Sequence, residues 1–459
     1  MRYIGVSTGH DGGIAIFNSN GGLEFFGLTE RYTRERHCDL ADLSELFPSV
    51  KWQPDDFVVM VANTDPNLEN VSTERLPWPP NLVRPYIPKI KDNYLAGWYG
   101  RSPNFVLNHH ICHAIASWCF RPDDQDRLYV VCDGSGSDTY GSLNSCLVGM
   151  ITKAGFYNFG DFVNIPTTNP LNNLVGPNSA GKLMELSGYR ADQWDLDKVF
   201  SHYIKASIDK KTHDSKWPVI DMNNEKDLDF AANFYRWYIG EVVWGEIKAN
   251  IDKYPNSNGV VVGGGTALAI ELNTKIFNHT GQHVVCAPCA DNSGQALGAA
   301  AFAHFQCTGR WPMLKSPSLI ALQTDLPEVG RSNPKQVALR VYGNNVVGVL
   351  RGRAEAGPRS LGFRSMFAAP GKYSNAYVVS QKIKQRETYR PLSPVITDEQ
   401  FDNYFVGPRG KFMQYKVQCT ERATKELPSI VHKDGSATPQ VVSYANDPWL
   451  HNLLTEYGK

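Results

Sequence analysis

The sequence has no excess of charge, no long apolar run and no signal-like start. Lysine and arginine total 46, and aspartate and glutamate also total 46, so the 459-residue chain has a formal net charge of zero. This balance argues against a protein that coats nucleic acid, because such proteins rely on many uncompensated cations. No stretch approaches the roughly 18 apolar residues that a spanning helix needs. The N-terminus lacks the basic and apolar regions of a signal peptide. We therefore expect a cytoplasmic globular protein with no membrane partner and no large nucleic-acid surface.

Cysteine is also scarce. The nine cysteines do not form the paired motifs of a zinc knuckle. Cys286 and Cys289 make a lone C-x-x-C pair, which we interpret as buried free thiols. The chain has no repeat of fixed period, but four prolines interrupt any regular pattern between residues 311 and 336. We predict a linker there, between a domain of residues 1–310 and a smaller domain of residues 337–459.

Three short apolar runs in the first domain each end in a glycine-bearing turn. They occupy residues 3–7, 128–132 and 260–262. Each run is typical of a buried strand, and a following glycine lets the backbone come close to a phosphate. The arrangement resembles the nucleotide-binding fold shared by actin, hexokinase and the heat-shock chaperone ATPases. We predict an α/β fold with an actin-like, two-lobed first domain.

The segment NHHICHA holds the sharpest local pattern. His109 and His113 are four residues apart, so a helix would place both on one face, where they can grip one metal ion. Asp133 directly follows an apolar run, and Asp291 precedes a helix of small residues, so both are candidate carboxylate ligands. Two further histidines in N-terminal loops offer acid–base or oxyanion-stabilising groups. These are His10 and His37.

Nine motifs occur in the order seen in one enzyme family. They are GHDGGIAIF, LTERYTRERH, NHHICHAIAS, CDGSGSDTYG, GKLMEL, GGGTALAIELN, APCADNSGQALGAA, EAGPRSLGFRS and IKQRETYRPLSPVI. Through them the whole chain resembles the NodU/CmcH-type O-carbamoyltransferases, which modify nodulation factors and antibiotics.

The resemblance implies a fold and a reaction. The first domain would be similar to the actin-like metalloprotein that makes threonylcarbamoyladenosine on tRNA, and the second would be an α/β domain of YrdC-like type. Carbamoyl phosphate and ATP, with Mg²⁺, would give carbamoyl-adenylate and pyrophosphate in the second domain. The carbamoyl group would then pass to a hydroxyl of an acceptor at the metal site. A sugar, an antibiotic and a modified nucleotide all remain open as acceptors.

The resemblance also implies a role for individual residues. The metal ligands would be His109, His113, Asp133 and Asp291, with iron(II) or another divalent ion. The catalytic groups would be His10 and His37 at the transferring carbamoyl, and Arg359, Lys384 and Arg390 at the phosphates. The nucleotide would contact Gly134, Gly136, Lys182, Gly263, Gly264, Gly265 and Asn273.

The chain departs from the family pattern at three places. Ala269 replaces a family asparagine, and Thr438 stands where the family has an arginine. The family normally continues beyond Lys459 into a strand and a loop that complete the adenylate site. A second polypeptide that supplies this strand, a site that works differently, and a loss of the first half-reaction are therefore all open.

Two other functions remain as alternatives. An actin-like kinase or ATPase would use the same glycine loops with Mg²⁺, but Mg²⁺ prefers oxygen ligands to the histidine pair. A non-catalytic subunit that binds nucleotide or metal also fits. We expect a homodimer, since closed symmetry is common among enzymes. A reactive adenylate needs protection from water, so we expect the two domains to pack tightly.

Overall fold

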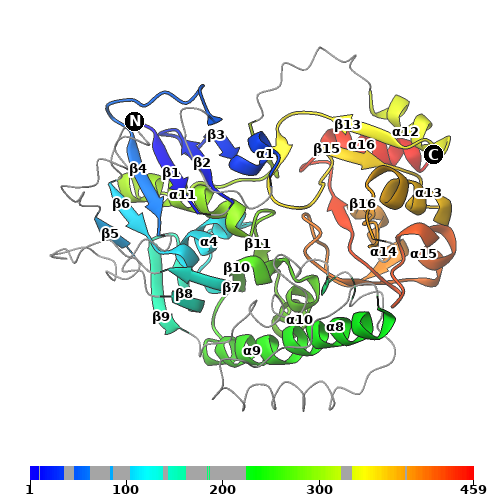
Figure 1. Cartoon of the computed structure of the whole chain (residues 1–459), viewed down its shortest axis with the longest axis horizontal. Helices are drawn as coiled ribbons and strands as arrows, with labels where there is room; N and C mark the ends of the chain where they lie inside the picture. Colours follow the sequence, from blue (N-terminus) through cyan, green and yellow to red (C-terminus); the bar gives the residue numbers. More distant parts are fainter. Residues whose placement is uncertain are drawn as a thin grey trace.

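A computed structural model shows how the chain folds. It describes residues 1–9, 11–35, 46–62, 83–85, 104–137, 143–161, 183–184, 186, 224–321, 333–387 and 390–459. Two large β-sheets and their helices form an N-terminal part, and a C-terminal part of small sheets and short helices packs beside it (Figure 1). The predicted α/β class is confirmed. In the described part of the chain, no helix has the length and apolarity needed to cross a lipid bilayer.

The first sheet contains six strands in the order β3-β2-β1-β4-β6-β5. The strands are β1 (Tyr3–Ser7), β2 (Gly13–Phe17), β3 (Leu23–Leu28), β4 (Phe57–Val61), β5 (Val83–Pro85) and β6 (Phe105–Leu107). The first three form an antiparallel meander, and β4 and β6 continue the sheet in parallel to β1. Every residue of β1 and β2 is buried, which explains their continuous apolar runs.

The second sheet repeats this topology. Its order is β11-β10-β7-β8-β9. The strands are β7 (Arg127–Ser137), β8 (Leu143–Thr152), β9 (Gly155–Asp161), β10 (Val260–Gly263) and β11 (Val285–Cys286). The first three are again an antiparallel meander, and β10 and β11 again extend it in parallel. The sequence has no repeat of fixed period, but in the described part of the chain the two sheets share the same order over five strands, and β5 is an additional antiparallel strand at the edge of the first.

Two buried helices lie between the sheets. Helix α11 (Gln295–Thr308) packs on the first sheet, helix α4 (His109–Trp118) packs on the second, and the two helices contact each other. All ten residues of α4 and the first eleven of α11 are buried. The small side chains of α11 permit this close packing. For example, the space for a Cβ on Gly298 is taken by the Cys112 carbonyl oxygen.

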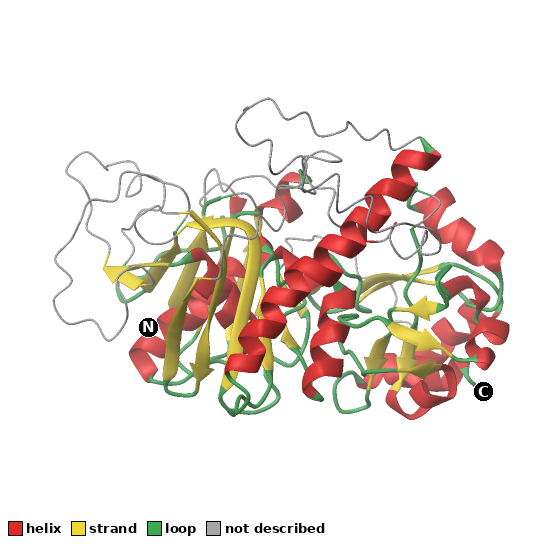
Figure 2. Cartoon of the chain, turned by 90° about the horizontal axis from the view of Figure 1, so that it is seen from below, coloured by secondary structure: helices red, strands yellow, loops and turns green. Residues whose placement is uncertain are grey.

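A long helix spans the outer side of the second sheet. It consists of α8 (Glu225–Trp237), a π-helical stretch (Tyr238–Val243) and α9 (Trp244–Lys253) without a break. In Figure 2 this helix runs across both parts of the molecule. Its apolar face joins a core that includes residues of the second sheet and of the C-terminal part, such as Phe401 and Val417. The expected close packing of the two parts is therefore observed.

The C-terminal part is built from short elements. Its helices are α12 (Pro334–Tyr342), α13 (Tyr373–Tyr377), a π-helical turn (Val378–Ile383), α14 (Phe401–Tyr404), α15 (Glu421–Glu426) and α16 (Pro448–Tyr457). Its strands are β13 (Val347–Leu350), β14 (Ala354–Glu355), β15 (Arg364–Phe367), β16 (Val395–Thr397), β17 (Phe405–Val406), β18 (Val417–Cys419), β19 (Ser436–Ala437) and β20 (Gln440–Val442). Helices α12 and α16 cover the β13–β15 hairpin and share a small core with it.

The predicted linker begins with packed residues. The Trp311 ring stacks on Phe305 at a centroid distance of 3.9 Å, and its Nε1 donates to the Thr152 carbonyl at 2.9 Å. Strand β12 (Ser318–Ile320) pairs with β14 of the C-terminal part. Residues 311–321 therefore join the two parts through a short sheet. Cys286 and Cys289 are buried free thiols, as predicted.

Candidate active site

Helix α4 holds the histidine pair that the sequence singled out. The side chain of Asn108 caps this helix by accepting hydrogen bonds from the backbone N–H groups of His110 and Ile111, at 2.8 and 3.1 Å. The cap fixes the first turn directly after β6, because it satisfies donors that have no partner within the helix. His109 and His113 therefore lie one turn apart on one face. Their Nε2 atoms are 3.3 Å from each other.

Asp133 meets both imidazoles from the second sheet. Its Oδ2 lies 3.3 Å from His109 Nε2 and 3.1 Å from His113 Nε2. Burial disfavours the charged carboxylate, but the two histidines outweigh this effect and hold the pKa of Asp133 well below its usual range. The cluster therefore contains an ionised carboxylate at neutral pH.

The geometry of this cluster fits a metal ion. Two ligands that bind one ion at about 2.1 Å lie about 3.0 Å apart at a right angle and about 3.4 Å apart at a tetrahedral angle. The three observed separations, from 3.1 to 3.3 Å, fall within this range. Among the described residues, these three are the group of histidine, cysteine and acidic side chains close enough to share an ion. Two imidazoles and one carboxylate suit a divalent transition metal.

The three-glycine loop packs against this cluster. The space for a Cβ on Gly263 lies 2.9 Å from the Cβ of His113, so a larger residue would push against α4. Gly264 has a φ of 82°, which favours glycine, and a Cβ there would meet the Cys132 carbonyl oxygen at 2.2 Å. The Gly265 N–H points to Asp133 Oδ1 at 3.4 Å. The loop that was predicted to bind a nucleotide therefore packs directly against His113 and Asp133.

Asp291 lies close to the cluster but outside it. Its Oδ1 caps a short 3-10 turn (Asn292–Gly294) by accepting from the backbone N–H and hydroxyl of Ser293. Burial and the negative charges of Asp11 and Glu30 raise the pKa of Asp291. The two predicted carboxylate ligands therefore differ, because Asp133 is held ionised and Asp291 is pushed towards its protonated form.

Gln295 occupies the place beside the two histidines. Its Nε2 lies 2.8 Å from His109 Nε2 and 3.2 Å from His113 Nε2, and it donates to Asn292 Oδ1 at 3.0 Å. Its Oε1 accepts from the Ser7 hydroxyl at 3.0 Å. Sequence reasoning missed Asn292 and Gln295. The sequence did hold a signal for these two residues, because they follow Asp291 by one and four positions at the start of a buried helix.

One cavity of about 1840 Å³ connects the cluster with the C-terminal part. Asp11, Asp133 and Asp291 line it from the N-terminal part. Asp11 has a φ of 63°, an unusual conformation for a residue other than glycine, and such residues gather at functional sites. Sequence reasoning named Asp11 only together with His10. The sequence signal for Asp11 as a site residue was its position as an acidic residue inside a glycine-bearing turn.

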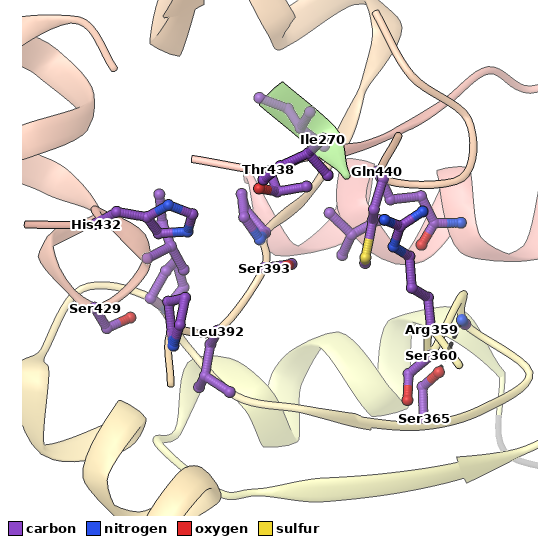
Figure 3. Close-up of a pocket in the computed structure, with 18 of the residues that line it drawn as sticks. Ile270, Arg359, Ser360, Ser365, Leu392, Ser393, Ser429, His432, Thr438 and Gln440 are labelled. Atoms are coloured by element: carbon purple, nitrogen blue, oxygen red, sulfur yellow. Dashed lines mark hydrogen bonds between the residues drawn. The ribbon is translucent and has the colours of Figure 1, made fainter. Parts of the chain in front are cut away.

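The predicted cationic residues line the same cavity from the C-terminal part. Arg359, Lys384 and Arg390 all contribute to its wall. Arg359 donates to the backbone carbonyls of Leu268 at 2.8 Å and Phe412 at 3.3 Å, so it bridges the two parts. Figure 3 shows its side chain among the residues that line the cavity. Burial lowers the pKa of Lys384, and the nearby charges of Arg386 and Arg390 add to this effect. The wall therefore presents a concentration of positive charge.

A buried carboxylate shapes the loop that carries Arg359. Glu355, at the end of β14, is only 5% exposed. Burial opposes its charge, but hydrogen bonds from the following loop outweigh that effect and lower its pKa. Its Oε1 accepts from the N–H groups of Leu361, Phe363 and Arg364, and from the hydroxyl of Ser365, at 2.8 to 3.0 Å.

The remaining predicted residues fall into three groups. Gly134 and Gly136 belong to strand β7. Asn273, on α10 (Ile270–Thr280), is fully buried, and its Nδ2 donates to the carbonyls of Ala267 and Gln414, so it ties the two parts together. Its role in nucleotide binding stays a prediction. Three predicted residues lie outside the described part of the chain. These are His10, His37 and Lys182.

Comparison with known proteins shows which family the chain resembles. Residues 338–459 match the family described as "Carbamoyltransferase C-terminus". The chain is 24% identical over 520 aligned positions to nodulation protein U of Azorhizobium caulinodans, and the alignment covers 100% of this chain and 91% of that protein. The chain is a homologue of the carbamoyltransferases. The family resemblance predicted from the nine motifs is therefore confirmed.

Another relative of this carbamoyltransferase homologue is the 3'-hydroxymethylcephem-O-carbamoyltransferase of Amycolatopsis lactamdurans. The two are 28% identical over 303 positions, which cover 61% of this chain and 56% of that enzyme. The chain thus aligns with less than two thirds of the cephem enzyme. Among solved structures, the activator of the 2-hydroxyisocaproyl-CoA dehydratase from Clostridium difficile aligns with 67% of this chain and 95% of that chain. The identity is 11% and the TM-score is 0.36.

Proposed function

We propose that this carbamoyltransferase homologue is an ATP-dependent O-carbamoyltransferase. In the first half-reaction, water removes the phosphoryl group of carbamoyl phosphate as inorganic phosphate, and the carbamate oxygen attacks the α-phosphorus of ATP. Pyrophosphate leaves, and carbamoyl-adenylate remains. In the second, the oxygen of an acceptor hydroxyl bonds to the carbamoyl carbon, the hydroxyl proton passes to a base, and AMP leaves. Both half-reactions are balanced with carbamoyl phosphate, ATP, water and the acceptor.

The single observation that carries this proposal is the shared cavity. It runs from Asp133, which contacts both histidines, to Lys384 and Arg390 in the C-terminal part. A cavity with a candidate metal site at one wall and cations at the other suits two successive reactions on one carbamoyl group. The parts share a core and are joined by strand pairing, so both proposed sites belong to one packed body.

The cationic wall is proposed to bind the phosphates. Guanidinium groups offer forked donors that match phosphate oxygens, and an ammonium adds a compact charge. Lys384 and Arg390 would hold the phosphoryl groups of carbamoyl phosphate and ATP, the latter with its Mg²⁺. Arg359, anchored on carbonyls of both parts, would face the carbamoyl group between the two sites.

His109, His113 and Asp133 are proposed to hold iron(II) or another divalent ion. Such an ion, when bound, polarises a carbonyl oxygen as a Lewis acid. The Gln295 amide lies beside the same two Nε2 atoms, and its own position is fixed by Ser7. Asp11 and Asp291, with His10 and His37 as implied by the family, are the candidates that accept the proton of the attacking hydroxyl.

We also propose a fold for each of the two parts and a chemical class for the acceptor. Two sheets that share the same order over five strands support an actin-like N-terminal part, and a YrdC-like C-terminal part is proposed from the family resemblance. The acceptor is a small molecule, sugar or nucleotide with a free hydroxyl. Cytoplasmic location and a homodimer stay predictions of the sequence.

A half-reaction assay tests the proposal. The purified, iron(II)-loaded chain is incubated with carbamoyl phosphate and ATP without an acceptor, and pyrophosphate and carbamoyl-adenylate are followed by mass spectrometry. Pyrophosphate release that requires carbamoyl phosphate is the expected result. ATP cleavage to ADP, or no turnover together with retained nucleotide and metal binding, would overturn it in favour of a kinase-like enzyme or a binding subunit.

A further inference from the structure

One histidine in the wall of the cavity plays no part in the proposed chemistry. His432 follows a 3-10 turn (Pro428–Ile430) and begins a tight turn before β19. Its N–H donates to the Ser436 carbonyl at 2.8 Å, and its own carbonyl accepts from Gly435 N–H at 2.9 Å. In Figure 3 its ring projects into the cavity, near Ser393 and Ser429. The backbone of His432 is therefore fixed.

The hydrogen bonds around His432 define which ring nitrogen carries the proton. The Ser436 hydroxyl donates to Asp434 Oδ1 at 2.6 Å, and the Ser436 N–H donates to the same oxygen at 3.1 Å. Asp434 is also paired with Lys416 Nζ at 2.7 Å, so this carboxylate is ionised and only accepts. The single hydroxyl proton of Ser436 is thus committed to Asp434, and its oxygen faces His432 Nδ1 at 3.1 Å as an acceptor.

His432 Nδ1 must therefore carry a proton. Burial, with a smaller effect of Lys416, lowers the pKa of His432 to about 4, against the opposing effect of Asp434, so the ring is neutral at pH 7. A neutral ring with a proton on Nδ1 has a bare lone pair on Nε2. His432 Nε2 is buried and has no hydrogen-bond partner in the described part of the chain. A buried acceptor of this kind calls for a donor from a bound molecule.

The surroundings of Nε2 restrict the donor. The nearby wall is made of small polar side chains, Ser393, Ser429 and Thr438, with Leu392 beside them (Figure 3). These four side chains offer no flat aromatic face on which a purine base stacks. The cations of the cavity face phosphate oxygens, which offer no proton at neutral pH. The donors in the proposed substrates are the ribose hydroxyls and adenine amine of ATP and the primary amide of carbamoyl phosphate, and the amide is the smallest of these groups.

We infer that His432 is a specificity-determining residue that accepts a hydrogen bond from the carbamoyl NH₂ group through Nε2. This inference rests on the proposed function. Ser436 and Asp434 act as positioning residues, because they keep the proton on Nδ1. The arrangement distinguishes carbamoyl phosphate from acyl phosphates whose acyl group has no N–H, such as acetyl phosphate. An acetyl group leaves the lone pair of His432 unsatisfied.

Calorimetric binding of two probes to the full chain tests this inference. Wild type is expected to bind carbamoyl phosphate at least about tenfold more tightly than acetyl phosphate, which corresponds to one lost hydrogen bond at a buried acceptor. His432→Phe keeps a ring of similar size and is expected to abolish this preference. His432→Gln, which can present an amide oxygen near the Nε2 position, is expected to restore part of it. His283→Phe is the control, because His283 is not among the residues that line the cavity and its Nδ1 already contacts the Tyr415 hydroxyl at 3.3 Å.

A second measurement does not depend on how the variants fold. In ¹⁵N NMR spectra of the wild-type chain, we expect the ring nitrogens of His432 to show a protonated Nδ1 and an unprotonated Nε2. Carbamoyl phosphate should shift the Nε2 signal and acetyl phosphate should not. In Ser436→Ala the fixed tautomer is expected to be lost, which a merely structural role for Ser436 would not produce.

The outcomes separate the inference from the proposed function. If wild type bound carbamoyl phosphate but His432→Phe kept the preference, or if the bare nitrogen were Nδ1, the inference alone would fail. If His432→Phe weakened ATP binding and left the preference unchanged, the donor would be a nucleotide group instead, and the inference would be overturned. If wild type bound neither acyl phosphate, the proposed function would fail as well.

Discussion

The Nε2 atoms of His109 and His113 lie 3.3 Å apart, although the two residues belong to different turns of one buried helix. Two neutral imidazoles can share at most one N–H···N hydrogen bond there, and the buried carboxylate of Asp133 that faces both of them is best balanced by a positive charge. Either a proton or a metal ion can supply it. Measuring the metal content of the protein and its variants distinguishes the proton from the metal ion.

Replacing one histidine should remove the metal. We expect His113→Ala to lower the bound iron or other divalent ion at least about tenfold, because loss of a ligand leaves one imidazole and one carboxylate. Metal content is read by mass spectrometry after loading and desalting. His279→Ala is the control, since His279 is paired with Asp252 on the surface. Equal metal content in both variants would show that the cluster holds a proton only.

The glycine loop gives a second prediction. In Gly263→Ala the new methyl group meets His113 at about 3 Å. We expect a loss of about 1–3 kcal/mol of unfolding free energy and weaker metal binding, because α4 must shift. Gly245→Ala is the matched control. Outside its own helix, no atom of the described residues lies within 4 Å of the added Cβ there, and Gly245 is inside α9, so about 0.5–1 kcal/mol of stabilisation is expected. An unchanged metal affinity in Gly263→Ala would contradict this account.

Arg359 separates the two proposed sites. We expect Arg359→Glu to abolish pyrophosphate release and to leave the metal content unchanged, because its guanidinium contacts carbonyls of Leu268 and Phe412 and none of the three cluster residues. Arg310→Glu makes the same charge change at an exposed position and should keep full activity. Loss of metal from the Arg359 variant would show that the division into two sites is wrong.

Glu355 predicts a pH dependence of stability. Its pKa in the folded chain lies below the usual 4.5, so it stabilises the fold at pH values above about 4.5, and this contribution is lost as the pH falls through the lowered pKa. Glu355→Gln should cost about 1–3 kcal/mol at pH 7. The difference from wild type should shrink on acidification.

Urea unfolding at pH 7 and at pH 4 measures this difference. Glu421→Gln, at an exposed position on α15, should have little effect at either pH. A difference between wild type and Glu355→Gln that grew towards low pH would show that Glu355 is not held as the anion.

Local patterns predicted much of the site. The i and i+4 spacing of the two histidines survives in α4, and the apolar runs at residues 3–7, 128–132 and 260–262 became β1, the start of β7, and β10. These features depend on neighbours in the sequence, so the sequence alone defines them.

Features made by distant residues were not predictable in this way. The repeated strand order of the two sheets leaves no periodic signal, because different side chains fill the two sheets. Gln295 enters the cluster only because α11 packs against α4, and His432 matters only because Ser436 and Asp434 fix its tautomer. Asp291 and Asn273 also take part in hydrogen bonds that the motifs did not predict, and their assignment to a metal and to a nucleotide stays a prediction.

The shared core has a consequence for synthesis on the ribosome. Residues of the second sheet and of the long helix beside it pack against side chains as late as Val441. Until that residue leaves the exit tunnel, the nascent N-terminal part keeps an uncovered apolar face, which is a target for chaperones and for aggregation. If the two parts were made as separate chains, each would keep that face uncovered until the two associated. The chain is therefore expected to be inherited and folded as one unit.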